Sequence, residues 1–141
     1  MRSAASVLGV RLLVLSAVTE SEVAAAFATI VEQRAGALLT GTGVAAIDQV
    51  LSLARRYAVP TLFFTRRGVV SGGLASYGIP PNESIRKVAV YTGRILQGEK
   101  PADLPVVQPT KFELAINLKT AKALGLTIPE TLLATADEVI Q

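Results

Sequence analysis

The chain has 141 residues, half of them hydrophobic, which is enough for one domain with a hydrophobic core. Fourteen basic residues against eleven acidic ones give a net charge of +3, and no basic stripe interleaved with aromatic residues is present, so nucleic acid is not an expected partner. The sequence contains no cysteine and no histidine, which excludes disulfides, thiol nucleophiles, most metal sites and the side chain that most often acts as a general base.

The apolar stretch near the amino-terminal end of the sequence, residues 10–18, has two interpretations. A positive residue precedes it and small residues end it, as in a secretory signal peptide. Arg11 interrupts the stretch, however, and its uninterrupted part, Leu12–Leu15, is short for an export core. The same residues fit a buried strand, which is the interpretation we favour.

The next elements alternate between helix and strand. A capping box at Thr19–Glu22 predicts the start of a helix over about residues 20–34. A short apolar strand over 35–40, a helix that ends at Arg55–Arg56 and a third strand over 59–64 follow. With residues 10–18 as the first strand, the order is βαβαβ with short connections, which is typical of a parallel sheet covered by helices.

The second half of the chain follows a different pattern. Pro80–Pro81 opens a predicted helix with apolar residues on one side, and Gly98 ends it. Segment 99–109 contains three of the seven prolines, so we expect an extended connector there. The remaining predicted elements are a strand over Phe112–Ile116, a short helix capped by Asn117 that ends at Gly125, and a helix that begins with a capping box at Thr127–Glu130.

The segment Gly41–Ala46 (GTGVAA) has the G-x-G-x-x-A spacing with which a helix amino end can approach a pyrophosphate. A dinucleotide site also needs an acidic residue after the next strand, and Thr65–Arg66–Arg67 stands there instead. The arginines could meet a 2′-phosphate, so an NADP-binding oxidoreductase domain stays open as an alternative. A glycine turn that enters a helix is the simpler interpretation.

Hydroxyl groups and glycines follow the predicted strands, whereas the carboxylates form no catalytic pair. These residues are Ser16, Thr40–Gly43, Thr65–Arg66 and the stretch 71–78 (SGGLASYG). In a parallel α/β sheet, ligands bind at the carboxyl ends of the strands, where loops and helix amino ends offer free N–H groups. The pattern predicts a small polar ligand held by hydrogen bonds without chemistry, although serine, threonine and glycine are also ordinary turn residues.

Three stretches carry a resemblance to a known family: 72–78 (GGLASYG), 95–106 (ILQGEKPADLPV) and 108–126 (QPTKFELAINLKTAKALGL). Together they resemble ABC transporter substrate-binding proteins of the tryptophan/tyrosine-importer-like class. The resemblance implies part of a two-lobed type I periplasmic binding protein, an α/β, three-layer Rossmann-like fold with a parallel sheet flanked by helices. It also implies a periplasmic, non-enzymatic receptor without cofactor or metal, which binds a small solute such as an amino acid and delivers it to an inner-membrane ABC permease.

The resemblance covers the carboxyl-terminal half of such a protein, which implies a truncated form. Residues 1–59 would belong to the second lobe, 60–98 would return to the first lobe, and 99–141 would supply a hinge-crossing strand and the carboxyl-terminal helices. Because most of the first lobe is missing, apolar surfaces would be exposed unless another copy covers them. We therefore expect a homodimer, with a rearranged compact monomer as the alternative.

The resemblance also suggests which residues bind the solute. With one lobe missing, the solute would be buried on one side only, so we expect weak binding by this chain alone, and a vestigial fragment that binds nothing stays open as an alternative. Each hydrogen bond would contribute about 0.5 to 1.5 kcal/mol. The predicted ligand-binding residues are Gly41, Thr42, Gly43, Thr65, Arg66, Gly72 and Gly73.

Overall fold

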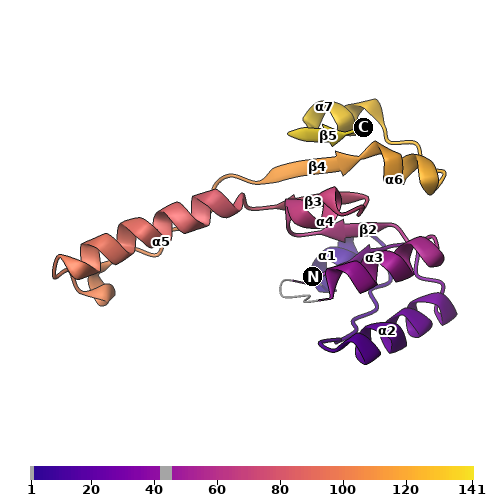
Figure 1. The fold of residues 1–141 in the computed structure, drawn as a ribbon, viewed down its shortest axis with the longest axis horizontal. Helices are drawn as coiled ribbons and strands as arrows, with labels where there is room; N and C mark the ends of the chain where they lie inside the picture. The colour runs from indigo at the N-terminus through magenta and orange to yellow at the C-terminus, as the bar shows by residue number, and fades with distance from the viewer. Residues whose placement is uncertain (1, 42–45) are drawn as a thin grey trace.

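Strands and helices alternate through most of the chain. The computed structural model describes residues 2–41 and 46–141. Figure 1 shows one sheet with helices packed beside it and one long helix that projects away from it. In chain order the elements are α1 (Arg2–Val7), α2 (Glu20–Glu32), β1 (Leu38–Leu39), α3 (Ile47–Arg56), β2 (Thr61–Phe63), α4 (Arg66–Val70), β3 (Ala75–Gly78), α5 (Pro81–Leu96), the 3₁₀ helix η1 (Pro101–Asp103), β4 (Glu113–Asn117), α6 (Leu118–Ala123), α7 (Glu130–Thr135) and β5 (Glu138–Ile140).

The five strands form a single sheet in the order β1-β2-β3-β4-β5. The pairs β1–β2, β2–β3 and β4–β5 are parallel, and only β3–β4 is antiparallel. The crossovers α3 and α4 connect the first three strands. The alternating sequence pattern predicted α3, whereas α4 and β3 were not predicted. The α/β fold class with a mostly parallel sheet flanked by helices is therefore confirmed.

Residues 10–18 do not form the predicted first strand. The segment has no helix or strand assignment, and β1 lies at the edge of the sheet. Instead, Leu15–Val18 line a cavity beside α2 and β1, and Ala17 packs against the core. The prediction was wrong because a strand requires a backbone partner at matching register, and in this segment most of the apolar side chains stay exposed.

The hydrophobic core lies where α2 and α3 pack together beside the sheet. The capping box that begins α2 is confirmed, because the Glu22 N–H donates to Thr19 Oγ1 (3.3 Å) and the Thr19 N–H donates to Glu22 Oε2 (2.8 Å). The aromatic ring of Phe27 stacks on Tyr57 at a centroid distance of 6.5 Å. The buried core residues are Val23, Phe27, Ile30, Val50, Leu51, Ala54, Val59 and Phe63.

Helix α5 leaves the sheet after β3, and the chain returns to the sheet in β4. Figure 1 shows α5 standing away from the other elements, and none of its residues is buried. At its base, the rings of Tyr77 and Phe112 stack at 5.5 Å, which joins the outgoing and returning segments. Gly98 follows the helix with φ +100°, as expected for the predicted stop.

The predicted divisions 1–59, 60–98 and 99–141 all contribute strands to the one sheet. Because β2 pairs with β1 and β3 pairs with β2, only the part of segment 60–98 that follows Gly78 departs from the sheet. The lobe assignment itself stays a prediction. Within the described residues, no helix combines the length and apolar character that crossing a bilayer requires.

The two helices near the carboxyl-terminal end test two predicted caps. The first is confirmed: the side chain of Asn117 accepts a hydrogen bond from the Thr120 N–H at 3.1 Å and begins α6. The second is wrong, because α7 starts at Glu130 after Pro129, and this start has no side-chain cap bond. Thr127 lies two residues before the cap position, too far upstream to accept from the first turn.

Candidate functional site

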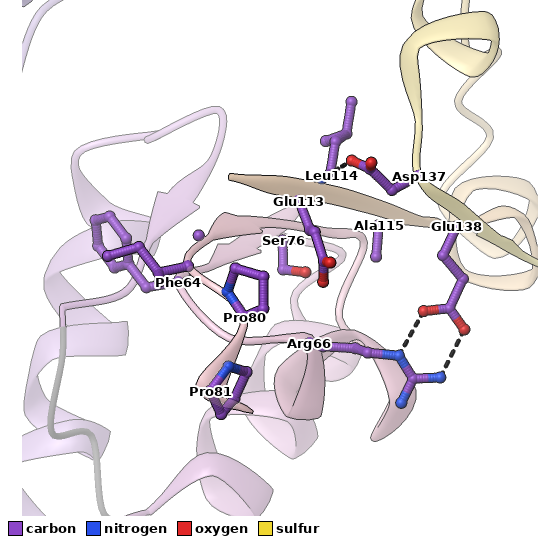
Figure 2. A pocket seen from close by; sticks show the side chains of 12 residues that line it. Phe64, Arg66, Ser76, Pro80, Pro81, Glu113, Leu114, Ala115, Asp137 and Glu138 are labelled. Carbon is purple, nitrogen blue, oxygen red and sulfur yellow. Dashed lines mark hydrogen bonds and ion pairs between the residues drawn. The ribbon is translucent and has the colours of Figure 1, made fainter. Parts of the chain in front are cut away.

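A cavity of about 350 Å³ opens at one edge of the sheet, where β2 and β3 end and β4 and β5 begin. The antiparallel direction of β4 brings the starts of β4 and β5 beside the carboxyl ends of β2 and β3. This is the edge at which open α/β sheets bind ligands. Figure 2 shows the lining side chains, which come from the loop after β2, the end of β3, the start of α5 and the starts of β4 and β5.

Arg66 and Glu138 form a two-pronged ion pair on one wall of this cavity. The guanidinium donates from Nε to Oε2 at 2.5 Å and from Nη2 to Oε1 at 2.6 Å. The hydrogen bonds from Arg66 lower the pKa of Glu138, and those to Glu138 raise the pKa of Arg66. Both side chains are substantially exposed, so the pair orients the two groups more than it stabilises the fold.

Two further carboxylates line the same cavity. Asp137 accepts from the Leu114 N–H at 2.8 Å, which holds the start of β5 beside β4. Glu113 pairs with Lys111 Nζ at 2.9 Å, and in Figure 2 its carboxylate lies between Ser76 and Arg66. The lining therefore carries three carboxylates and one guanidinium. Among the described residues, no cluster of acidic side chains is arranged to hold a metal ion.

A glycine holds the loop after β2 close to β3. A Cβ built on Gly78 would lie 1.9 Å from the carbonyl oxygen of Phe64 and 2.9 Å from its carbonyl carbon. Real Cβ atoms do not approach backbone that closely, so only glycine allows the two segments to meet here. This contact fixes the loop from which Arg66 extends, because Arg66 is the second residue after Phe64.

Three of the predicted ligand-binding residues lie at this carboxyl edge. Thr65 precedes α4 and is exposed, and Arg66 lines the cavity described above. Gly41 follows β1 and lines the separate cavity of about 300 Å³ beside α2. Thr42 and Gly43, with most of the GTGVAA motif, lie outside the described residues.

Gly72 and Gly73 lie at the opposite end of the sheet. The sequence analysis placed the whole SGGLASYG stretch at the carboxyl edge, which is wrong for these glycines because they precede β3. A Cβ on Gly72 would lie 2.1 Å from Arg55 Nη2, and one on Gly73 would lie 2.5 Å from the ring of Phe63. Close packing against Phe63 therefore accounts for Gly73, and the positive φ of +113° accounts for Gly72.

Sequence reasoning missed Ser76, Glu113, Asp137 and Glu138 as members of one site. The sequence analysis expected no catalytic pair among the carboxylates, and nothing near the end of the sequence suggested a fifth strand that would bring Asp137 and Glu138 to this edge. Glu113 begins a strand whose direction the sequence does not state. The apolar pair Val139-Ile140 was the available signal, and two residues are too few to indicate a strand.

Several solved structures share this fold. A conserved domain protein from Vibrio cholerae has a TM-score of 0.89 and 28% sequence identity, over 98% of this chain and 47% of its own. An ABC domain from Streptococcus pneumonia, in complex with L-Trp, has a TM-score of 0.87 and 28% identity, over 98% of this chain and 49% of its own. The open, ligand-free structure of a substrate binding protein with adhesive properties from Clostridium difficile matches in fold, with a TM-score of 0.66 and 23% identity, over 99% of this chain and 48% of its own.

The chain thus spans about half the length of the solved structures that it matches. A comparison with curated proteins gave no match. The family described as ABC transporter substrate binding protein matches residues 1–140, almost the whole sequence. This match agrees with the fold, and the chain belongs to the ABC transporter substrate-binding protein family.

Proposed function

We propose that this chain supplies one side of the solute site of an ABC importer's binding protein and performs no chemistry. Its family and its likeness to a structure that holds L-Trp support this proposal. In this proposal the protein acts outside the inner membrane and passes its solute to a permease of that membrane. Because the chain spans about half of its structural relatives, a second unit would cover the other side of the solute.

The charged cavity carries the proposal. A free amino acid has an ammonium and a carboxylate a few bonds apart, and the cavity lining offers a guanidinium beside three carboxylates. Its volume of about 350 Å³ lies at the small end of the range for ligand pockets. We infer that the solute class is amino acids or similarly small zwitterions.

The geometry of Arg66 suggests how the solute would be oriented. Glu138 uses Nε and Nη2 of the guanidinium, and Nη1 makes no hydrogen bond to the described residues. In our proposal the solute carboxylate accepts from Nη1, while its ammonium donates to Glu113 and Ser76. A charge-assisted hydrogen bond contributes about 1.5 to 3 kcal/mol, so the arginine contact would be a major part of a weak affinity.

The experiment measures L-tryptophan binding by calorimetry, with its methyl ester and N-acetyl derivative as probes that each lack one charge. We expect both derivatives to bind at least about tenfold more weakly, which corresponds to the loss of about 1.4 kcal/mol. Arg66→Met should weaken the binding of L-tryptophan by a similar factor. Arg67→Met is the matched control, because Arg67 is also exposed in α4 but does not line the cavity.

Three outcomes would contradict the proposal. A thermal shift with NADPH and none with amino acids would favour the oxidoreductase alternative, since a ligand of the folded state raises its stability by mass action. A well-folded protein that shifts with neither would favour a vestigial fragment. Equal effects of Arg66→Met and Arg67→Met would place any amino-acid site away from this cavity.

A further inference from the structure

Glu138 reaches Arg66 because the register of the sheet directs its side chain there. Ser76 pairs with Ala115 and Ala115 pairs with Glu138, so these three residues form one row across β3, β4 and β5. Paired residues of neighbouring strands point to the same face of a sheet, and a slip of one residue would turn the side chain to the other face. Glu138 therefore lies on the face of Ser76 and Ala115, and Figure 2 shows it meeting Arg66 there.

The two residues between the partners of this ion pair are small. Arg66 begins α4 directly after β2, and Glu138 begins β5, so the pair spans the two strands that lie between β2 and β5. Ser76 and Ala115, which lie on these strands, are 3% and 4% exposed. Their short side chains leave space in front of them, and this space is part of the cavity. The ion pair therefore belongs to the cavity and faces any solute that enters it.

The two carboxylates on this face of the sheet each have a cationic partner. Glu138 pairs with Arg66, and Glu113 pairs with Lys111 at 2.9 Å. The hydrogen bonds from Arg66 lower the pKa of Glu138, so its carboxylate is ionised at neutral pH. These four charges sum to zero. A solute that carries only a carboxylate is repelled by the carboxylate with which it must share the arginine, whereas a zwitterion brings its own ammonium to offset that repulsion.

We propose that Glu138 is a specificity-determining residue, which makes the cavity select zwitterions against solutes that carry a carboxylate without an ammonium. This inference rests on the proposed function, because it assumes that the solute carboxylate accepts from Arg66. Glu138 acts as a positioning residue: it holds Nε and Nη2 of the guanidinium and offsets the positive charge that would attract any anion. Without this carboxylate, the arginine would bind both classes of solute.

The ion pair can be altered without loss of the fold. The side chains of Arg66 and Glu138 are 56% and 36% exposed, and exposed ion pairs contribute little to stability. Glu138→Gln has nearly the same size, keeps one oxygen that accepts from the guanidinium and removes only the charge. We expect its circular dichroism spectrum and its Tm to match those of wild type.

The first experiment measures the binding of L-tryptophan and indole-3-propionate, which lacks only the ammonium, by calorimetry. We expect wild type to bind indole-3-propionate at least about tenfold more weakly than L-tryptophan. Glu138→Gln should reduce this ratio of Kd values at least about tenfold, mainly because indole-3-propionate binds more tightly. An unchanged ratio in this variant would overturn the inference and leave the proposed function standing.

Asp137→Asn is the matched control, because it removes the same charge from the neighbouring residue. Consecutive residues of a strand point to opposite faces, and Figure 2 shows Asp137 beside Leu114, away from Arg66. Asparagine can still accept from the Leu114 N–H, so the start of β5 keeps its contact. We expect the ratio of Kd values in Asp137→Asn to stay close to that of wild type. An equal change in Asp137→Asn and Glu138→Gln would overturn the inference.

The second experiment tests whether Glu138 acts through Arg66. The double variant Arg66→Met/Glu138→Gln should bind indole-3-propionate no more tightly than Arg66→Met, and a gain that persists without the arginine would overturn the inference. Wild type that binds neither solute would contradict the proposed function. Glu138→Gln then decides the inference, because binding of indole-3-propionate by this variant would support it and no binding would overturn it.

Discussion

Asn117 connects three elements, and replacing it tests the packing around the sheet. Its side chain is 6% exposed, accepts from the Thr120 N–H at 3.1 Å and donates from Nδ2 to the Val69 carbonyl at 3.1 Å. Asn117→Ala removes a helix cap, which contributes about 1 kcal/mol, and a buried hydrogen bond of about 0.5 to 1.5 kcal/mol. The Val69 carbonyl keeps its bond from the Gly72 N–H, so no larger penalty for an unpaired carbonyl is added.

We therefore expect Asn117→Ala to lower the free energy of unfolding by about 2 kcal/mol, or roughly 6 °C in Tm for a chain of this size. Denaturant unfolding followed by circular dichroism measures this change. Asn117→Ser keeps a cap acceptor and should recover about half of the loss. Asn82→Ala, at the chain's other asparagine, is exposed on α5 and should change stability by less than about 0.5 kcal/mol. A loss for Asn117→Ala no larger than that of this control would refute the reasoning.

The remaining predictions concern the site. Gly78→Ala should lower the free energy of unfolding by about 1 to 3 kcal/mol and weaken solute binding, because the new methyl group meets the Phe64 carbonyl. Gly36→Ala is the control and should change stability little, because open space surrounds Gly36. Glu138 should titrate below the usual glutamate range in carboxyl NMR spectra, since its pKa is lowered by Arg66. Its ion pair is then complete at neutral pH and is lost as the pH falls through that lowered pKa. An unchanged Glu138 titration in Arg66→Met would contradict the assigned cause.

Local signals in the sequence predicted α2, α3, α5 and α6, whereas α1 and α4 were not predicted. Thr19 and Asn117 are short polar residues at helix starts, and each makes the cap bond that its position indicates. Gly98 and Gly125 end their helices with positive φ, which glycine adopts readily. Each of the caps at Thr19 and Asn117 joins residues three positions apart, so the local sequence is enough to predict the cap. The predicted cap at Thr127 was wrong, because Pro129 occupies the cap position and α7 begins after it.

Long-range pairing was predicted less well. The site needs the antiparallel register Ser76↔Ala115 and the parallel register Ala115↔Glu138, and no local pattern specifies either. Arg66 was predicted correctly as a residue of the carboxyl edge, but its partner Glu138 lies 72 positions away. Residues 10–18 have the composition of a strand, yet pairing depends on a neighbouring backbone that composition does not describe.

The start of α5 couples the orientation of this helix to the shape of the cavity. The residues that lead into α5 also line the cavity: Gly78, Pro80 and Pro81. The stacked rings of Tyr77 and Phe112 join the segment that enters α5 to the segment that returns from it. A small tilt of α5 would rotate these residues at the start of the helix. The rotation would change the space in front of Arg66. A partner that binds the far end of α5 would therefore open or narrow the cavity without touching a residue that lines it.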